Sequence, residues 1–324
     1  MSHRKLHELP FMDLYVRLDG KSTPHYHTSI KSEQADLDND VPPEFHHDTD
    51  ELIKLLCDSF TRDEMGIVFD GIRLRASKVR TAGGQIWVAM RRIADKPPPL
   101  DKLGFTPGLV PHLRKLGKRD GLILLCGATG EGKTTTSCSL LSEYLDTYGG
   151  VAFTIEDPVE YHMEGRRGKT GFCYQIEIGE EHEWAEMLKR SLRWHPRYIF
   201  VGEVRTPDAA NQLLRAATSG HLVITTMHAG TIEEALEGML QLAEQSIGDR
   251  APLLLAAGLV GVLHQSLTPI GLQASFIITE PNSPGAPIRS VIRDKRIGQC
   301  RTYSDQQMAL LMKSGKIFRE QSNF

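Results

Sequence analysis

The sequence has few cysteines, and their placement excludes two common uses of that residue. Among 324 residues there are five, which are scattered, odd in number and never spaced as Cys-x-x-Cys. A disulfide framework and a zinc module both require paired, regularly spaced cysteines. We therefore expect free thiols in a reducing compartment, at Cys57, Cys126, Cys138, Cys173 and Cys300.

The chain also lacks an excess of charge of either sign. Its 38 Lys and Arg residues oppose 41 Asp and Glu residues, which gives a net charge of −3 and an isoelectric point of about 6.5. General attraction to nucleic acid or to an anionic membrane requires a strong positive balance. We therefore expect no direct nucleic-acid partner, although local basic patches stay open.

No apolar run is long enough to cross a bilayer, which takes roughly 20 residues. The longest, APLLLAAGLVGVL at residues 251–263, is expected to form a buried helix. The first 20 residues are too polar for a secretory signal. A hydrophobic share of 40% and a charged share of 24% exclude collagen, coiled coil and wholesale disorder. We expect a cytoplasmic protein, long enough for two domains.

Residues 1–47 are polar and carry nearly half of the thirteen histidines. We predict a flexible polar tail there, because so few apolar side chains are available for a core. Pairing of histidines as metal ligands is an alternative, for His25 with His27 and His46 with His47, but no frame of cysteines or carboxylates fixes a geometry. The histidines of this segment are His3, His7, His25, His27, His46 and His47.

Residues 48–96 predict a small α+β domain. The segment TDELIKLLCDSF has helical apolar spacing, and GIVFDGIRLRASKVR and GQIWVAMRRI alternate as strands around a glycine turn. Three consecutive prolines, Pro97–Pro99, cannot continue a strand or helix. We therefore place a connector at residues 97–100.

Residues 101–324 alternate apolar strands with amphipathic helices, without internal repeats. The strands, such as GLILLCG and YIFVGE, are nearly continuous apolar runs. This pattern is typical of a parallel sheet covered by helices on both faces. The sequence therefore predicts an α/β fold for this second domain.

The segment GATGEGKT, residues 127–134, has the full Gly-x4-Gly-Lys-Thr spacing of a phosphate loop between an apolar strand and a helix. Glycines let backbone N–H groups turn toward phosphate oxygens, and the helix N-terminus adds positive potential. This predicts binding of ATP or GTP, with Lys133 on the β- and γ-phosphates and Thr134 on Mg²⁺. The predicted binding residues are Gly127, Thr129, Gly130, Glu131, Gly132, Lys133, Thr134 and Thr135.

Hydrolysis also requires a carboxylate at the end of a neighbouring strand. TIEDPVEY offers Glu156, Asp157 and Glu160, and YIFVGEVR offers Glu203. We predict Glu203 as the base that activates water, with helix capping as its alternative role. In SGHLVITTMHAG only His228 lies at the carboxyl end of its strand, where an imidazole reaches a γ-phosphate.

Together these motifs resemble the hexameric ATPases of bacterial type II secretion, type IV pili and type IV secretion. GATGEGKT is similar to their phosphate loop, TIEDPVEY to their acidic box, HPRYIFVGEVR to their second nucleotide motif and SGHLVITTMHA to their histidine box. The similarity covers residues 48–324. PIRSVIRD, at 287–294, is similar to an element of the pilus-retraction branch, and some type IVB secretion and conjugation ATPases have a similar segment. The alternative interpretation of PIRSVIRD is a plain amphipathic stretch.

The resemblance implies a RecA-like motor domain behind a small PAS-like domain. It implies that Glu156 lies near metal and water, that Glu203 is the catalytic glutamate and that His228 senses the γ-phosphate. Arginines of the small domain complete the site in this family. The candidates are Arg80, Arg91 and Arg92, which could instead be ordinary surface residues.

The resemblance further implies a homo-hexamer that hydrolyses ATP with Mg²⁺. Such a ring works on a platform protein at the inner face of the bacterial inner membrane, in pilus retraction, pilus assembly or export of protein or DNA. The alternatives are a RecA-like nucleic-acid translocase and a nucleotide-gated scaffold without turnover. The near-neutral charge weighs against the translocase, and the intact Lys133 and Glu203 weigh against the scaffold.

Overall fold

The computed structural model describes residues 3–28, 39–60, 63–180, 182–268, 271–281 and 286–318. The chain forms two compact units, Met1–Lys96 with Pro158–His162, and Pro97–Asp157 with Met163–Phe324. The division between Lys96 and Pro97 falls at the start of the predicted connector. None of the helices in these described ranges is both long and apolar enough to span a membrane.

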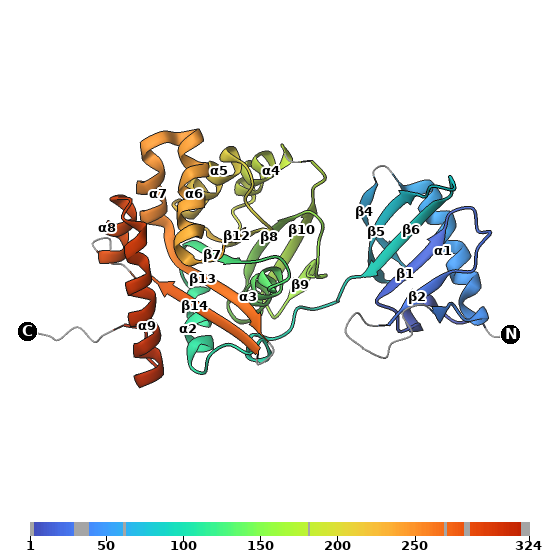
Figure 1. Ribbon diagram of the computed structural model, residues 1–324, viewed down its shortest axis with the longest axis horizontal. Helices are drawn as coiled ribbons and strands as arrows, with labels where there is room; N and C mark the ends of the chain where they lie inside the picture. Colours follow the sequence, from blue (N-terminus) through green and yellow to red (C-terminus); the bar gives the residue numbers. More distant parts are fainter. Residues whose placement is uncertain are drawn as a thin grey trace, which may run out of the picture. The chain divides into compact units, whose positions relative to one another are not determined.

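The first unit is an antiparallel sheet with one helix, α1, packed on one of its faces (Figure 1). The strand order is β3-β2-β1-β6-β5-β4. Alternate residues of the strands, such as Leu14, Leu74 and Val88, are fully buried in one core with Leu52 and Leu56 of the helix. The elements are η1 (Leu6–Glu8), β1 (Asp13–Arg17), β2 (His25–His27), β3 (Asn39–Asp40), η2 (Pro43–Phe45), α1 (His46–Ser59), β4 (Glu64–Phe69), β5 (Ile72–Arg80) and β6 (Ile86–Arg92).

The prediction of a flexible tail over residues 1–47 is wrong for the part of that range that the structure describes. The strands β1, β2 and β3 belong to the sheet, and Leu6, Leu9 and Phe11 are buried in its core. The small domain therefore begins well before Asp48. Because residues 1–47 are polar on average, the alternation of apolar and polar side chains in β1 was overlooked. The apolar side chains of β1 become part of a core only when the strand pairs with β6, which lies far along the chain.

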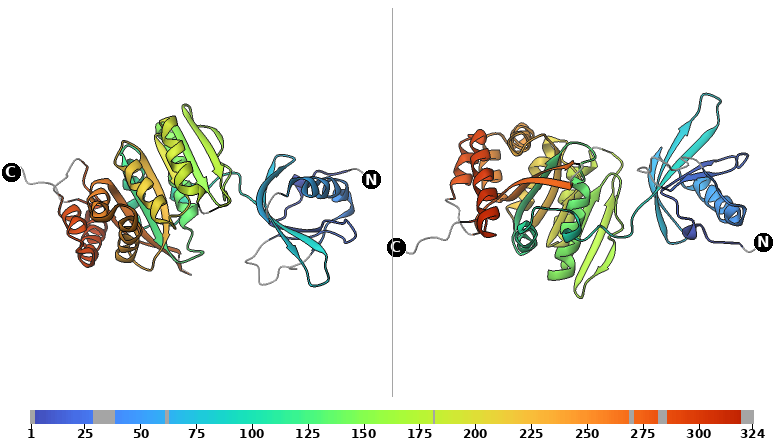
Figure 2. Two further views of the ribbon diagram at one scale, coloured as in Figure 1. Left: turned by 90° about the horizontal axis from the view of Figure 1, so that it is seen from above. Right: turned by 60° about the horizontal axis from the view of Figure 1, so that its bottom comes forward.

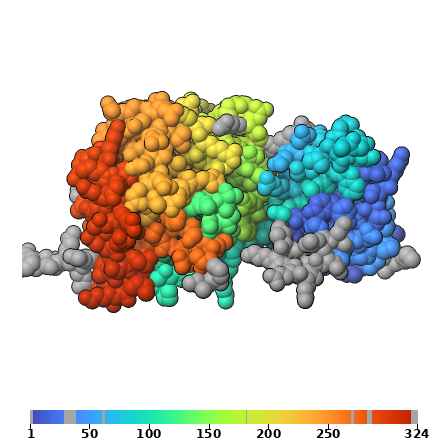
Figure 3. All heavy atoms as spheres, in the orientation of Figure 1, coloured from blue at the N-terminus to red at the C-terminus, as the bar shows by residue number. Residues whose placement is uncertain are grey.

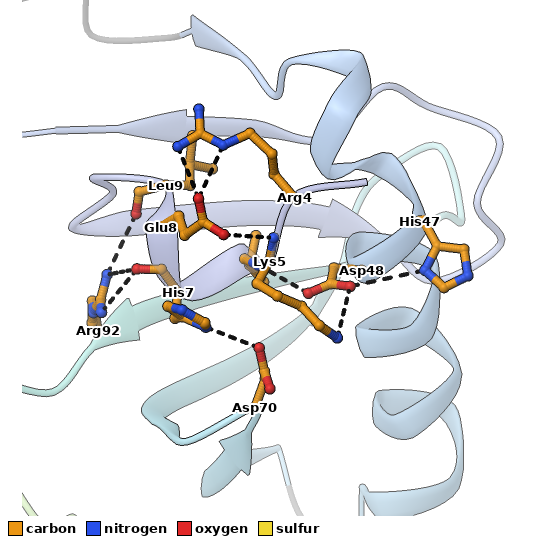
Figure 4. Close-up of polar contacts among 10 residues, drawn as sticks. Arg4, Lys5, His7, Glu8, Leu9, His47, Asp48, Asp70 and Arg92 are labelled. Atoms are coloured by element: carbon orange, nitrogen blue, oxygen red, sulfur yellow. Dashed lines mark hydrogen bonds and ion pairs between the residues drawn. The ribbon is translucent and has the colours of Figure 1, made fainter. Parts of the chain in front are cut away.

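Polar contacts hold the N-terminal segment against α1 and the sheet (Figure 4). The buried carboxylate of Asp48 accepts a hydrogen bond of 2.9 Å from the backbone N–H of Leu6 and lies 3.4 Å from the ammonium of Lys5. His7 pairs with Asp70 at 3.0 Å. A buried carboxylate is stable only with such partners, so these contacts fix where the segment lies.

The second unit is built on a mostly parallel sheet of order β14-β13-β7-β12-β11-β8-β10-β9 (Figure 1). The strands are β7 (Gly121–Gly127), β8 (Gly150–Glu156), β9 (Gly165–Arg167), β10 (Gly171–Glu177), β11 (Tyr198–Val201), β12 (Leu222–His228), β13 (Leu259–Thr268) and β14 (Gly271–Ile278). The α-helices are α2 (Leu109–Leu116), α3 (Lys133–Tyr148), α4 (Glu183–Ser191), α5 (Pro207–Ala217), α6 (Ile232–Ile247), α7 (Ala251–Gly258), α8 (Pro287–Arg293) and α9 (Cys300–Ser314). The short 3₁₀ turns are η3 (Leu100–Lys102), η4 (Leu192–Trp194), η5 (Gly248–Arg250) and η6 (Ile297–Gln299).

Helices cover both faces of this second sheet (Figure 2), as the sequence predicts. On one face, Ile199 and Val201 of β11 share a core with buried residues of α4, α5, α6 and α7. On the other face, the ring of Tyr198 lies 5.8 Å from that of Tyr144 in α3. The parallel α/β prediction is confirmed, with antiparallel strands β9 and β14 at the edges. The C-terminal helices α8 and α9, coloured red in Figure 3, lie on the surface of this unit.

The prediction of one buried helix over residues 251–263 is half wrong. Helix α7 ends at Gly258, and residues 259–268 form β13, which pairs in parallel with β7. The second half, LVGVL, contains the β-branched residues Val260 and Val262, which favour a strand. A short apolar run does not distinguish a buried helix from a buried strand, so the pairing with β7 decides.

The structure predicts that one of the five thiols reacts readily. Burial raises the pKa of Cys126, Cys173 and Cys300 to about 12, and Cys138 is fully buried, whereas Cys57 is exposed. Because the thiolate is the reactive form, titration of the native protein with Ellman's reagent should give one fast equivalent. The unfolded protein should give five. Two or more fast equivalents in the native protein would contradict the burial described.

Candidate nucleotide-binding site

The phosphate loop joins β7 to α3 in the predicted place, and its glycines are required by its backbone. Gly130 and Gly132 have φ of +83° and +76°, where other residues are strained. A Cβ atom on Gly127 would lie 2.4 Å from the backbone oxygen of Gln265. Helix α3 begins at Lys133, so its first N–H groups are directed at the loop. This is the arrangement that binds phosphate groups.

Lys133 is held inside the loop. Its side chain is buried, and its ammonium donates hydrogen bonds of 2.9 Å and 2.8 Å to the backbone oxygens of Gly127 and Ala128. It also lies 3.4 Å from Nδ1 of His228. These acceptors are neutral, so a phosphate would be a much stronger partner for the buried charge.

The remaining loop residues fall into two groups. Thr134 and Thr135 occupy the first turn of α3 and are half-buried, while the hydroxyl of Thr129 lies 3.4 Å from Nδ1 of His228. Glu131 is tied away from the loop interior, because its carboxylate accepts a hydrogen bond from the backbone N–H of Leu267. Its side chain therefore supports the loop from outside.

The strand order decides which residues face the loop. β12 lies between β7 and β11, so the strand that carries Glu203 is not adjacent to the phosphate loop. His228, the last residue of β12, is instead in register with Gly127 at the end of β7. About half of its side chain is exposed. The imidazole is therefore the group that links the loop to the next strand.

Glu203 lies two residues beyond β11 and faces His228. Its Oε2 is 3.6 Å from Nε2 of His228, and its Oε1 accepts a hydrogen bond from the guanidinium of Arg205. The hydroxyl of Thr226 donates 2.7 Å to the backbone oxygen of Gly202 and so fixes the segment on β12. The helix that follows is capped by Thr206 rather than by Glu203. The carboxylate is thus directed at the nucleotide edge of the sheet.

Glu156 is the last residue of β8, next to β11 in the sheet, and only 2% of it is exposed. Its Oε1 accepts a hydrogen bond of 3.2 Å from the side chain of Gln175. A buried carboxylate and the hydroxyl of Thr134 are oxygen donors of the kind that Mg²⁺ prefers, alongside phosphate and water. The donor set therefore fits a magnesium ion. Glu160, the other glutamate of this box, lies in the first unit.

The three candidate arginines all have partners within the small domain. Arg91 forms a bidentate pair with Asp13 at 2.7 Å and 3.0 Å, which raises the pKa of its guanidinium. Arg92 donates to the backbone oxygens of His7 and Leu9 (Figure 4). Arg80 donates to the backbone oxygen of Gly84 in its own hairpin. The role of these arginines in nucleotide hydrolysis stays a prediction.

Sequence reasoning missed three residues that support the site. Gln175 bonds to Glu156, Arg205 bonds to Glu203, and Gln265 bonds to the phosphate loop. Gln265 was not found because the first half of its strand, up to residue 263, was predicted to be part of a helix. Arg205 could have been noticed, since it follows Glu203 by two residues.

The fold and part of the sequence are shared with known proteins. The structure is similar to that of the pilus retraction motor PilT with bound ADP, with a TM-score of 0.70, 26% identity and coverage of 98% of this chain and 96% of that one. The structure is also similar to that of the ATPase DotB of Legionella pneumophila, with a TM-score of 0.69 and 18% identity, and the match covers 97% of this chain and 90% of DotB. At that identity the likeness is one of fold alone. The second unit therefore has the RecA-like core of these ATPases.

Curated relatives match over part of their length. The type II secretion system protein E of Xanthomonas campestris is 36% identical over 199 residues, which cover 60% of this chain and 32% of the relative. The type IV pilus assembly ATPase PilB of Thermus thermophilus is 34% identical over 202 residues, covering 60% and 21%. The chain thus spans a third or less of these relatives. Because the family model described as type II/IV secretion system protein matches residues 62–308, the chain belongs to that family.

Proposed function

We propose that this chain is an ATP-hydrolysing motor of a bacterial type IV pilus or type IV secretion machine. The observation that carries the proposal is the line of polar groups from Lys133 through His228 to Glu203, at the mouth of an intact phosphate loop. Membership of the secretion family and the likeness to an ADP-bound retraction motor support it.

The residues of this line divide the work of hydrolysis. The Glu203 carboxylate accepts the proton of a water whose oxygen attacks the γ-phosphorus, while the bond from phosphorus to the oxygen of the departing ADP breaks. In the tautomer that has its proton on Nε2, His228 donates to a γ-phosphate oxygen, and its Nδ1 is then the acceptor that lies 3.4 Å from the ammonium of Lys133. Lys133 leaves the loop carbonyls for the β- and γ-phosphates. Each group thus lies where it can stabilise charge that develops in the transition state as the bond breaks.

Thr134 and Glu156 would hold Mg²⁺ in this scheme. When bound, the ion neutralises charge on the β- and γ-phosphate oxygens. Gln175 keeps the Glu156 carboxylate in one orientation. Thr134 and Glu156 belong to separate elements, α3 and β8.

We further propose that the chain works as a homo-hexamer on a platform protein at the inner face of the bacterial inner membrane. In such a ring Arg80, Arg91 or Arg92 of the small domain would complete a site, and a planar cation suits a transferring phosphoryl group. Arg91 would have to exchange its pair with Asp13 for a phosphate. Residues 97–100 would then be the hinge between the two units.

A phosphate-release assay on the purified full chain with Mg²⁺ and ATP, with and without single-stranded DNA, tests this function against a nucleic-acid translocase. A protein motor should turn over in both samples at the same rate, because no strongly basic surface is expected from the net charge. Light scattering in the presence of a non-hydrolysed ATP analogue should give the mass of a hexamer. Strong stimulation by DNA would favour the translocase, and absence of turnover in an assembled hexamer would favour a scaffold.

A further inference from the structure

Strand β13 contacts the phosphate loop along its length, on the side of β7 away from His228 and Glu203. The side-chain amide of Gln265 donates a hydrogen bond of 2.6 Å to the backbone oxygen of Glu131. The backbone oxygen of Gln265 closes on Gly127 at the start of the loop, and its side chain passes beside Gly132 at the end. Gln265 therefore lies against the loop at its start, at Glu131 and at its end.

The neighbouring residue adds a second tie. The backbone N–H of Leu267 donates to the carboxylate of Glu131. Glu131 is therefore fixed through both its backbone oxygen and its side chain. These two ties restrain the part of the loop that carries the positive φ angles of Gly130 and Gly132.

The chemistry of Gln265 points beyond packing. The residue is 1% exposed, and its Oε1 has no hydrogen-bond partner among the residues that the structure describes. Burying an unpaired carbonyl oxygen costs stability, and a methionine of similar size would fill the space without that cost. The orientation of the amide is fixed, because only its NH₂ group can face the backbone oxygen of Glu131. The cost of the unpaired Oε1 is offset by the hydrogen bond with which the amide NH₂ fixes the phosphate loop.

We propose that Gln265 is a positioning residue of the nucleotide site, which keeps the phosphate loop in its binding conformation before nucleotide arrives. A loop that is already ordered loses less conformational entropy when it binds. Gln265 acts through Glu131 and touches no reacting atom, so its loss weakens nucleotide binding and leaves the chemical step alone. This inference rests on the proposed nucleotide function.

The test is Gln265→Met in the full chain, with Gln307→Met as the matched control. Gln307 of α9 also fixes strand backbone, donating 2.7 Å to the oxygen of Ile278 and accepting 2.9 Å from its N–H, but it does so away from the loop. Both changes remove an amide from the same unit. Titration with a fluorescent ATP analogue and steady-state phosphate release give Kd, KM and kcat, and thermal unfolding reports stability.

Gln265→Met should raise Kd and KM about tenfold, the effect of one lost hydrogen bond, with kcat at saturation within about twofold. Gln307→Met should lower stability and leave Kd unchanged. Glu131→Ala changes a partly exposed side chain and removes only the hydrogen bond from the N–H of Leu267, so it should raise Kd by less than Gln265→Met does. This variant keeps the inference testable if Gln265→Met does not fold. Unchanged Kd in Gln265→Met and Glu131→Ala would overturn the inference, as would a fall in kcat at constant KM.

The same titration separates this inference from the proposed function. If the wild-type chain binds the analogue and Lys133→Ala does not, the nucleotide site stands whatever Gln265 does. If Gln265→Met then binds as tightly as the wild type, the positioning role alone fails. If the wild-type chain itself does not bind, the proposed function fails first.

Discussion

Lys133→Ala should abolish detectable nucleotide binding and, with it, turnover. Lys133 supplies the only ammonium that the described structure places inside the phosphate loop, where it already lies within 2.9 Å of two loop oxygens. Losing one preorganised hydrogen-bond donor that stabilises charge in a transition state typically costs about 10²–10³-fold in rate, or about 2.7–4 kcal/mol. Here the loss also removes ground-state binding of the phosphates. Titration with a fluorescent ATP analogue and phosphate release measure the two effects.

The control for this change is Lys115→Ala, which removes a lysine from the exposed side of α2 in the same unit. It should leave Kd and turnover unchanged. Circular dichroism should confirm that both variants are folded. Binding by Lys133→Ala at wild-type affinity would contradict the phosphate-loop assignment, because nucleotide binding would then not depend on the ammonium of Lys133.

Glu203→Gln should separate binding from hydrolysis. The amide keeps the shape of the carboxylate but cannot accept a proton, and positioned general bases contribute about 10²–10⁴-fold to rates. We expect kcat to fall by that factor while Kd for nucleotide changes little, since Glu203 lies beyond β11 and does not touch the phosphate loop. Comparison of phosphate release with equilibrium titration checks both parts.

Glu237→Gln is the matched control for this variant, because Glu237 is an exposed residue of α6 in the same unit. It should behave as the wild type in both assays. Normal turnover by Glu203→Gln would contradict the assignment of Glu203 as the base. The next candidate would be Glu156, the buried carboxylate at the end of the adjacent strand.

The parts of the fold that were predictable from the sequence are those with strong local patterns. The apolar strands β7, β8, β11 and β12 and the phosphate loop carry their signals within a few residues. Glu203 and His228 were each predicted at the carboxyl end of a strand, and because parallel strands end at one edge, the structure brings the two side chains to 3.6 Å of each other. The order of the strands was not predictable, and it places β12 between β11 and the phosphate loop, with His228 between Glu203 and Lys133.

The parts that were missed depend on partners distant in sequence. Residues 13–17 look polar on average and become a central strand only through pairing with β6. Residues 259–268 become a strand through pairing with β7, and this alone brings Gln265 to the phosphate loop. For residues 259–268 the β-branched Val260 and Val262 are only a weak local signal for a strand, and the pairing with β7 cannot be inferred from them. The contacts of Arg91 with Asp13 are equally non-local.

The most direct test of the central claim is phosphate release from ATP by the purified full chain with Mg²⁺, run beside Lys133→Ala and Glu203→Gln. The account predicts turnover in the wild type, none in Lys133→Ala together with loss of nucleotide binding, and none in Glu203→Gln with binding retained. Equal turnover in all three proteins would contradict it, because hydrolysis would then not depend on the line of groups from Lys133 to Glu203.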